Sequence, residues 1–223
     1  MYIKNESGHD RWIDLSLPIQ AGMPVYPGDP PVSVRRFLTH GCNGVQASAI
    51  SLSCHAGTHV DVPRHYLPKG AALESILLDQ LTGPSLVVRA CLTAEGLIDL
   101  ASMDLSEQRA GDNLLLATGW DRLAGKPAYY QDIPRFAPGS TRFLLEKGIP
   151  ILGLDLPTVE EAADPPDHDM MHQVLLEEGI LIVECLCGLE KIIGRRVQFY
   201  AFPLLLPGCD GSPVRACARM LPV

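Results

Sequence analysis

Histidines and an aspartate with the spacing of metal ligands are concentrated in one short segment of the chain. His55, His59, Asp61 and His65 fall within eleven residues, and all four stand at odd positions. Side chains alternate between the two faces of an extended strand, so these four would project to the same side. A face that carries imidazole and carboxylate groups is suited to binding a divalent metal ion.

The spacing also requires a bend in this segment. His59 and Asp61 would lie roughly 6.6 Å apart along a strand, whereas His55 and His59 would lie about 13 Å apart, too far to share one ion. Gly57 stands between the two histidines and permits the chain to bend there. We therefore predict a compact site of His55, His59 and Asp61. For His65, at the far end of the segment, the spacing allows two roles, a further ligand or a free base.

A second pair of ligand-type residues lies in the last third of the chain. Glu184 interrupts the apolar run 180–186, and a buried carboxylate is costly unless it is paired or binds a metal. His172 lies in the helix expected just before that run. For Glu184, the alternative is that it pairs with an arginine or ends the strand. For His172, the alternative is a His-x-x-x-His pair with His168. The helix-breaking segment 165–167 (Pro-Pro-Asp) argues against the His168–His172 pair, because His168 would then precede the helix.

The elements that must position these residues indicate a mixed α/β protein. Helices are predicted over 140–147, with Ser140 as N-cap and Gly148 as the stop, and over 169–178, before Gly179. Buried strands are predicted over 85–90, 113–117, 151–154 and 180–186. Strand and helix alternate from 113 to 186, which is typical of α/β folds. The β-rich segments 12–17, 32–38 and 45–53 predict antiparallel sheet. We expect one domain over residues 1–223, with a mixed β-sheet core and flanking helices.

Composition excludes several classes of function. The formal net charge is −8, and nucleic-acid binding or a polybasic membrane anchor would need a basic surface. The N-terminus has no apolar run behind a basic start, and the most apolar stretch, 179–189, is about half a membrane span. We therefore expect a cytoplasmic protein that binds neither nucleic acid nor membrane. The seven irregularly spaced cysteines are expected to be free thiols.

The segment His55–His65 matches the motif H-x-G-T-H-x-D-x-P-x-H of the cyclase-like metal-dependent hydrolases, the family of bacterial kynurenine formamidase and isatin hydrolase. The resemblance extends over nearly the whole chain. Further segments that resemble the family are Trp12–Ile19, Gly22–Asp29, Thr118–Trp120, Gly153–Asp155 and Pro207–Arg215.

The resemblance implies a swivelling β/β/α-like fold and a site with two divalent ions. By that resemblance His55, His59 and Asp61 hold one ion, and Asp61 bridges to a second ion held by His172 and Glu184. Zinc is the expected metal, with manganese as the alternative. The resemblance also implies a homo-oligomer, a dimer or tetramer, with sites near the subunit contacts.

The same resemblance implies hydrolysis of a C–N amide bond, with His65 as the acid/base residue and metal-bound hydroxide as the nucleophile. The first expectation is an arylformamidase of tryptophan catabolism, which converts N-formyl-L-kynurenine and water to L-kynurenine and formate. The alternatives are a cyclic-amide hydrolase like isatin hydrolase and a non-catalytic metal-binding homologue. Tyr26, Tyr66 and Trp120 are candidates for an aromatic pocket wall, or equally for core packing.

Overall fold

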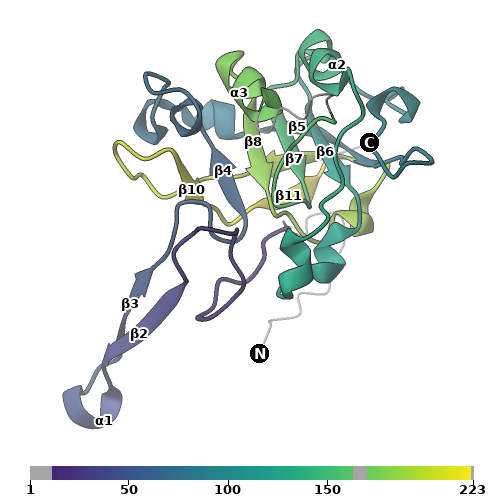
Figure 1. Cartoon of the computed structure of the whole chain (residues 1–223). Helices are drawn as coiled ribbons and strands as arrows, with labels where there is room; N and C mark the ends of the chain where they lie inside the picture. The colour runs from purple at the N-terminus through teal and green to yellow at the C-terminus, as the bar shows by residue number, and fades with distance from the viewer. Residues whose placement is uncertain (1–11, 163–169, 222–223) are drawn as a thin grey trace.

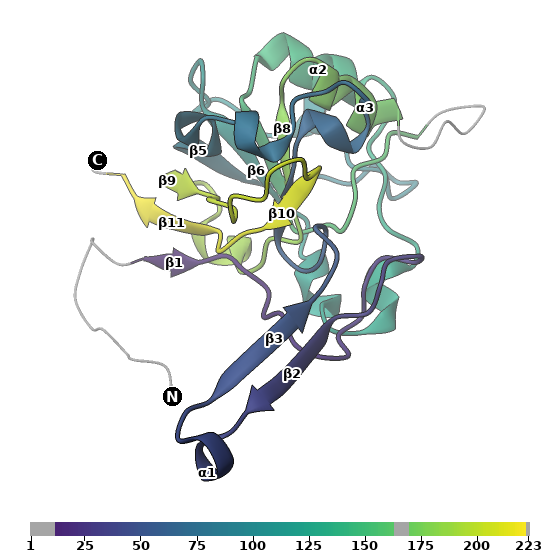
Figure 2. The same ribbon diagram turned by 90° about the vertical axis from the view of Figure 1, so that its left-hand side faces the viewer.

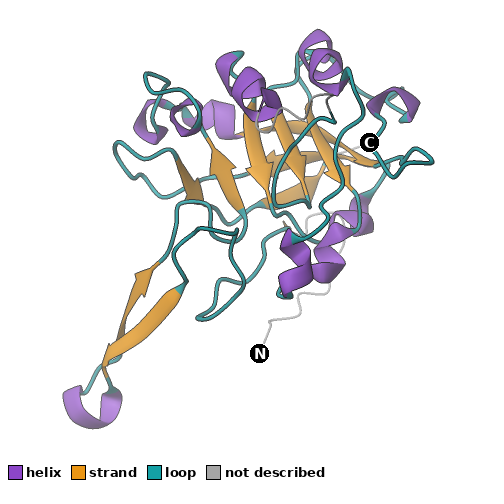
Figure 3. Ribbon diagram, in the orientation of Figure 1, coloured by secondary structure: helices purple, strands orange, loops and turns teal. Residues whose placement is uncertain are grey.

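A mixed nine-stranded sheet forms the centre of the molecule, as the computed structural model of residues 12–162 and 170–221 shows (Figures 1 and 3). Its strands are, in chain order, β1 (Ile13–Asp14), β4 (His59–Asp61), β5 (Thr82–Arg89), β6 (Asn113–Ala117), β7 (Ile151–Leu154), β8 (Leu181–Glu184), β9 (Arg196–Tyr200), β10 (Gly211–Pro213) and β11 (Cys217–Met220). Their spatial order is β1-β11-β9-β5-β6-β7-β8-β4-β10. The predicted fold class, a mixed-sheet α/β protein, is confirmed.

The parallel part of the sheet comes from the alternating segment of the sequence. Strands β5, β6, β7 and β8 pair in parallel, while the strands on either side of them pair antiparallel. The connections from β6 to β7 and from β7 to β8 carry α2 (Ser140–Lys147) and α3 (Met170–Glu177), which lie over one face of the sheet (Figure 1). Strands predicted over 113–117 and 151–154 have the observed bounds, and the other two differ by up to three residues.

The observed ends of α2 and α3 agree with the predicted stops but not with the predicted N-cap. Gly148 and Gly179 follow the helices in the left-handed conformation, as expected of C-terminal glycines. The predicted N-cap Ser140 is wrong by one residue, because Gly139 holds that position. The Glu161 carboxylate instead accepts hydrogen bonds from the backbone N–H groups of Gly139 and Thr141, at 2.6 and 2.7 Å. His168 and its predicted breaker lie outside the described residues.

Both faces of the central strands are buried, which explains their continuous apolar sequences. In β6, Leu114 and Leu116 pack with the cluster beneath the helices, whereas Leu115 and Ala117 pack with the cluster on the opposite face. Each fully buried leucine contributes about 2 kcal/mol through the hydrophobic effect. The sheet is therefore a rigid support for residues at its edge.

Seven short 3₁₀ helices occupy the connections between the described strands. They are η1 (Pro63–His65), η2 (Leu73–Ser75), η3 (Leu78–Leu81), η4 (Leu100–Ser102), η5 (Trp120–Leu123), η6 (Pro127–Tyr130) and η7 (Leu189–Ile192). Within the described ranges, no helix has the length and apolar character needed to span a bilayer.

A separate hairpin, residues 33–51, extends away from the body and is called the hairpin arm here (Figures 1 and 2). It consists of β2 (Ser33–Leu38), the short helix α1 (His40–Asn43) and β3 (Ala47–Ser51). The two strands pair antiparallel, which confirms the prediction for this part of the chain. The arm exposes several large apolar side chains: Val34, Phe37, Val45 and Ile50.

Candidate metal centre

Strand β4 supplies two of the candidate ligands and lies between β8 and β10. Its three residues are all buried, and the backbone register sets His59 opposite Glu184 of β8 and Asp61 opposite Gly211 of β10. His59 and Asp61 are separated by one residue and therefore share a face. The predicted extended geometry holds for this pair, with Asp61 only 1% exposed.

The predicted bend falls at Gly57, whose φ of +68° is a left-handed conformation that favours glycine. This bend turns the segment before Gly57 back toward the strand, so that His55 Nδ1 lies 2.8 Å from Asp61 Oδ1. The carbonyl oxygen of Gly57 accepts a hydrogen bond of 2.9 Å from Nδ1 of His59. His59 therefore presents Nε2 to the site, 3.3 Å from Asp61 Oδ1.

The extended geometry of the segment does not reach His65. The strand ends at Asp61, and Pro63 begins the 3₁₀ helix η1, for which its fixed φ is suited. The helix carries His65 back over the site, where its ring stacks on that of His55 with the centroids 4.0 Å apart. His65 is half-buried, and its ligand-type neighbours are His55 and Asp210.

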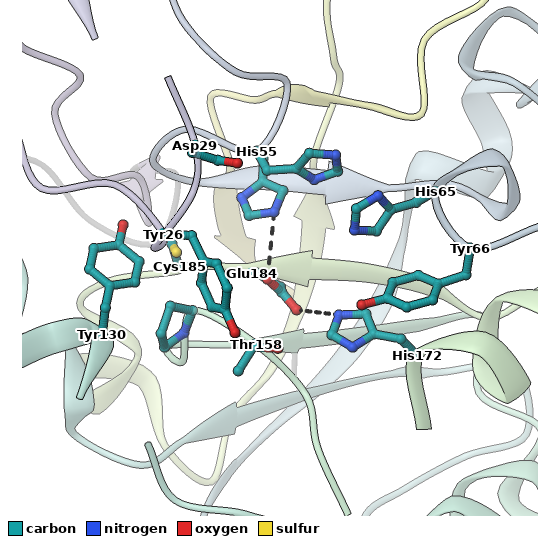
Figure 4. A pocket seen from close by; sticks show the side chains of 12 residues that line it. Tyr26, Asp29, His55, His65, Tyr66, Tyr130, Thr158, His172, Glu184 and Cys185 are labelled. Atoms are coloured by element: carbon teal, nitrogen blue, oxygen red, sulfur yellow. Dashed lines mark hydrogen bonds and ion pairs between the residues drawn. The ribbon is translucent and has the colours of Figure 1, made fainter. Parts of the chain in front are cut away.

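The buried carboxylate of Glu184 is at the end of β8 and faces imidazole rings. Its Oε1 lies 2.9 Å from His172 Nε2 (Figure 4). Its Oε2 lies 3.5 Å from His59 Nε2. His172 projects from α3 and is buried. Glu184 ends its strand, as one of its alternatives predicted. The predicted arginine partner is wrong: within the described ranges its ion-pair partners are His59 and His172.

Ligand-type atoms form two groups that share Asp61. One of these is His55, His59 and Asp61, and the other is Asp61, His172 and Glu184; a third group, His55, His65 and Asp210, does not include Asp61. Within each group the ligand-type atoms lie within 4.8 Å of one another. Oδ2 of Asp61 is buried and has no hydrogen-bond partner among the described residues. A buried carboxylate oxygen without a donor is costly, and a cation satisfies it. The geometry and the N/O donor set therefore fit two divalent ions bridged by one carboxylate.

The charges of the site are strongly coupled. Burial alone would lower the pKa values of His59 and His55, but Asp61 outweighs it and raises both. Burial alone would raise the pKa of Asp61, but the two histidines hold it well below its ordinary value. Without an ion, the site is thus held together by protonated imidazoles around a carboxylate. An ion must displace those protons.

His65 differs from His55 and His59 in the direction of its shift: burial lowers its pKa, and the nearby carboxylates do not outweigh that effect. Its neutral form is therefore favoured near neutral pH, as a proton acceptor requires. The ring borders a cavity of about 260 Å³. Aromatic side chains on this cavity are Tyr26, Tyr66 and Tyr130, with the Tyr66 ring stacked on His172 at 4.9 Å.

Some residues of this region were missed or misjudged from sequence. Trp120 does not line the cavity; its Nε1 donates to the Tyr129 carbonyl oxygen and its ring packs against the core. Tyr130 lines the cavity although no sequence pattern marked it. Asp210 contacts both His55 and His65 and was not among the predicted site residues. The segment 207–215 had resembled the family, but nothing in its sequence showed which side chain faces the histidines.

The two central family-like segments support the sheet rather than the ligand groups. The Asp155 carboxylate accepts hydrogen bonds from the backbone N–H and the hydroxyl of Thr118 and from the N–H of Gly119. At Gly153, a Cβ atom would lie 2.5 Å from a methyl group of Leu115. These segments thus fix the close packing of β6 and β7. All seven cysteines are free, as predicted, and none belongs to a ligand group within the described ranges.

Comparison with solved structures identifies the class of protein. A structure described as "Potential Metal-Dependent Hydrolase With Cyclase Activity" superposes with a TM-score of 0.75 at 27% identity, covering 96% of this chain and 99% of that one. An isatin hydrolase bound to the product analogue thioisatinate has a TM-score of 0.82 at 19% identity, over 97% and 94%, and shows the common fold. Fold and ligand groups together define a metal-dependent hydrolase.

Sequence relatives then give the family. The Cyclase family, described as "Putative cyclase", matches residues 13–161, more than half of the chain. The kynurenine formamidase of Paracidovorax citrulli (strain AAC00-1) is 32% identical over 222 residues, covering 92% of this chain and 95% of the relative. That of Geobacillus thermodenitrificans (strain NG80-2) is 32% identical over 215 residues, covering 94% and 98%. This chain belongs to the Cyclase family.

Proposed function

We propose that this protein is an arylformamidase that hydrolyses N-formyl-L-kynurenine to L-kynurenine and formate with two divalent ions. The observation that carries the proposal is the pair of ligand groups sharing Asp61 beside a cavity bordered by His65. Relatives at 32% identity over more than 90% of the chain support the formamidase activity.

When bound, divalent ions would supply Lewis acidity that activates water and polarises the formyl carbonyl. His55, His59 and Asp61 would hold one ion, and Asp61, His172 and Glu184 the other. Imidazole and carboxylate donors suit zinc, our first choice, and manganese is the alternative. Metal analysis of the purified protein, followed by removal and return of each metal, tests this choice.

In this proposal His65 moves the proton. Its neutral ring accepts a proton from the attacking water and then donates it to the leaving aryl nitrogen, so that the amine departs uncharged. The burial that lowers its pKa favours the first of these steps. The tyrosines on the cavity offer faces and edges against which an aryl ring packs.

A cyclic-amide hydrolase is the second candidate, favoured by the fold shared with isatin hydrolase. The same water attack would then open a lactam ring. The two functions are separated by measuring kcat/KM for N-formyl-L-kynurenine and for isatin with the zinc- and manganese-loaded protein. A much higher value for isatin would overturn the arylformamidase proposal, and turnover of neither, with both ions bound, would favour a non-catalytic homologue.

We also propose a homodimer in the cytoplasm, with the hairpin arm as a contact surface. An isolated two-stranded hairpin is marginally stable in water, and this one exposes Phe37 and Ile50 by 51% and 62%. A second copy of the chain, related by a twofold axis, would cover these side chains with the same surface of its own. Sedimentation analysis of the purified protein tests the assembly.

A further inference from the structure

Asp210 contacts two imidazole rings with the same carboxylate oxygen. Its Oδ2 lies 2.9 Å from Nε2 of His55 and 3.3 Å from Nδ1 of His65. A carboxylate oxygen accepts, so each ring nitrogen donates a proton to it. The two rings are stacked with an interplanar angle of 28°, which lets both edges reach one oxygen. Asp210 is thus placed between a candidate ligand and the candidate acid/base residue.

The fold holds this carboxylate at close range. The backbone oxygen of Asp210 accepts a hydrogen bond of 3.2 Å from the N–H of Val62, just after β4. The next residue, Gly211, pairs with Asp61. A Cβ atom at position 211 would lie 2.6 Å from the Val60 carbonyl oxygen and 3.0 Å from Cε1 of His55. The absence of a side chain there allows β10 to carry Asp210 up to the rings.

These contacts determine which nitrogen of each ring carries the proton. Without an ion, both ring nitrogens of His55 face carboxylates, Nδ1 toward Asp61 and Nε2 toward Asp210. If an ion displaced the Nδ1 proton, Nε2–H would stay on Asp210 and the freed Nδ1 lone pair would face the first ligand group. With Nδ1–H of His65 donating to the same oxygen, its Nε2 lone pair is left to accept a proton. One carboxylate therefore sets the tautomers of both rings.

We propose that Asp210 is a positioning residue that orients His55 for ion binding and His65 for proton transfer. Its side chain is 41% exposed, it meets His55 on the side opposite to Asp61, and it lies outside both groups that share Asp61, so we assign it as an outer partner, although its oxygen also forms a ligand-type group with His55 and His65. Carboxylates that hold a ligand histidine in this way typically affect metal affinity or activity 10–100-fold. The kinetic half of this inference rests on the proposed function, whereas the ion-affinity half does not.

The test compares Asp210→Ala and the isosteric Asp210→Asn with Asp210→Glu. Zinc affinity is measured by competition with a chromophoric chelator, and kcat and KM are measured with N-formyl-L-kynurenine. We expect Asp210→Ala to weaken zinc binding and to lower kcat, each on the order of 10–100-fold, with little change in KM. Asp210→Glu, which keeps the carboxylate, should recover part of both losses.

A matched control is Glu74→Gln. Glu74, in η2, accepts a hydrogen bond of 2.8 Å from the N–H of Gly208, so the substitution removes a negative charge that contacts the loop before Asp210 without touching either ring. Zinc affinity and kcat should stay at the wild-type values. If the control variant shows the same losses as Asp210→Ala, the effect is one of general charge or of the loop, and the proposal is wrong.

Two other results would overturn the proposal. Wild-type zinc affinity and kcat in both Asp210→Ala and Asp210→Asn would show that the contacts position nothing. One fewer bound zinc at saturation would make Asp210 a ligand. If wild-type protein binds zinc but does not hydrolyse N-formyl-L-kynurenine, the proposed function fails, and the zinc affinities of the variants still decide the role of Asp210.

Discussion

Strand β4 and the strands of the hairpin arm all pair antiparallel with their neighbours, but the two regions differ in which side chains are buried and which are exposed. In β4, charged and polar groups are enclosed, and Asp61 is 1% exposed. In the arm, apolar groups are exposed, and Ile50 is 62% exposed. The usual distribution is reversed in both regions. Each region is therefore incomplete by itself: we infer that β4 requires ions and that the arm requires a second protein surface.

The largest expected effect comes from removing the carboxylate shared by the two ligand groups. Asp61→Asn should reduce metal content to one ion or none and lower kcat/KM by on the order of 10³-fold or more, since Lewis-acid stabilisation is worth several kcal/mol. Elemental analysis and steady-state kinetics check both quantities. Two tightly held ions in this variant would rule out the bridging role.

His65→Ala should separate proton transfer from ion binding. We expect both ions to stay bound, because His65 lies outside the two groups that share Asp61, while kcat falls by about 10²–10⁴-fold. The measurement combines metal content with kcat. Loss of an ion on this substitution would make His65 a ligand and contradict its assignment as the acid/base residue.

The pH dependence of ion binding follows from the raised pKa values of His55 and His59. Below those pKa values each ion must displace a proton, so zinc affinity should rise with pH, by about tenfold per unit for each proton displaced, and level off above them. The stability of the ion-free protein has the opposite dependence on pH. Its histidine pairs stabilise it below the unfolded-state pKa of histidine, and this stabilisation is lost as pH rises through the raised values.

Thermal unfolding across this range, with a chelator and with excess zinc, measures both trends. The gain in unfolding temperature on adding zinc should grow as pH increases. A gain that is constant with pH would show that the imidazoles are already deprotonated before the ion binds.

The arm should have the smallest effect on the site. Phe37→Asp or Ile50→Asp should convert the proposed dimer to monomer while leaving metal content unchanged, because all ligand-type atoms of the two groups come from one chain. Leu92→Asp, on an equally exposed side chain outside the arm, is the matched control. Sedimentation velocity measures the oligomeric state of each variant. A dimer that survives both arm substitutions would place the subunit contact elsewhere.

Local patterns in the sequence were sufficient for much of the framework. The apolar runs 113–117 and 151–154 define β6 and β7, and Gly57 marks the bend because the ligand spacing requires one there. His172 and Glu184 could be joined to His55, His59 and Asp61 only through the resemblance, because nothing local shows that β8 pairs with β4. The single-domain boundary at 1–223 stays a prediction.

The rest depended on contacts between distant parts of the chain. Asp210 reaches His55 only because Gly211 lacks a side chain where β10 meets β4. The turn into η1 follows locally from Pro63, but nothing in the sequence showed that it would stack the His65 ring on that of His55. The local sequence thus accounts for the end of the strand, whereas the positions of His65 and Asp210 beside His55 depend on tertiary contacts.

The position of β4 between β8 and β10 has a consequence for synthesis of the chain. Both neighbours are made long after β4 itself, so a nascent chain that has reached Asp61 lacks both strands whose backbones later pair with β4. On the proposed ligand set, the second ion has no complete set of donors until Glu184 has been added. Loading with two ions therefore belongs to the last stage of folding, and the energy of ion binding is available to hold the two distant ends of the site together.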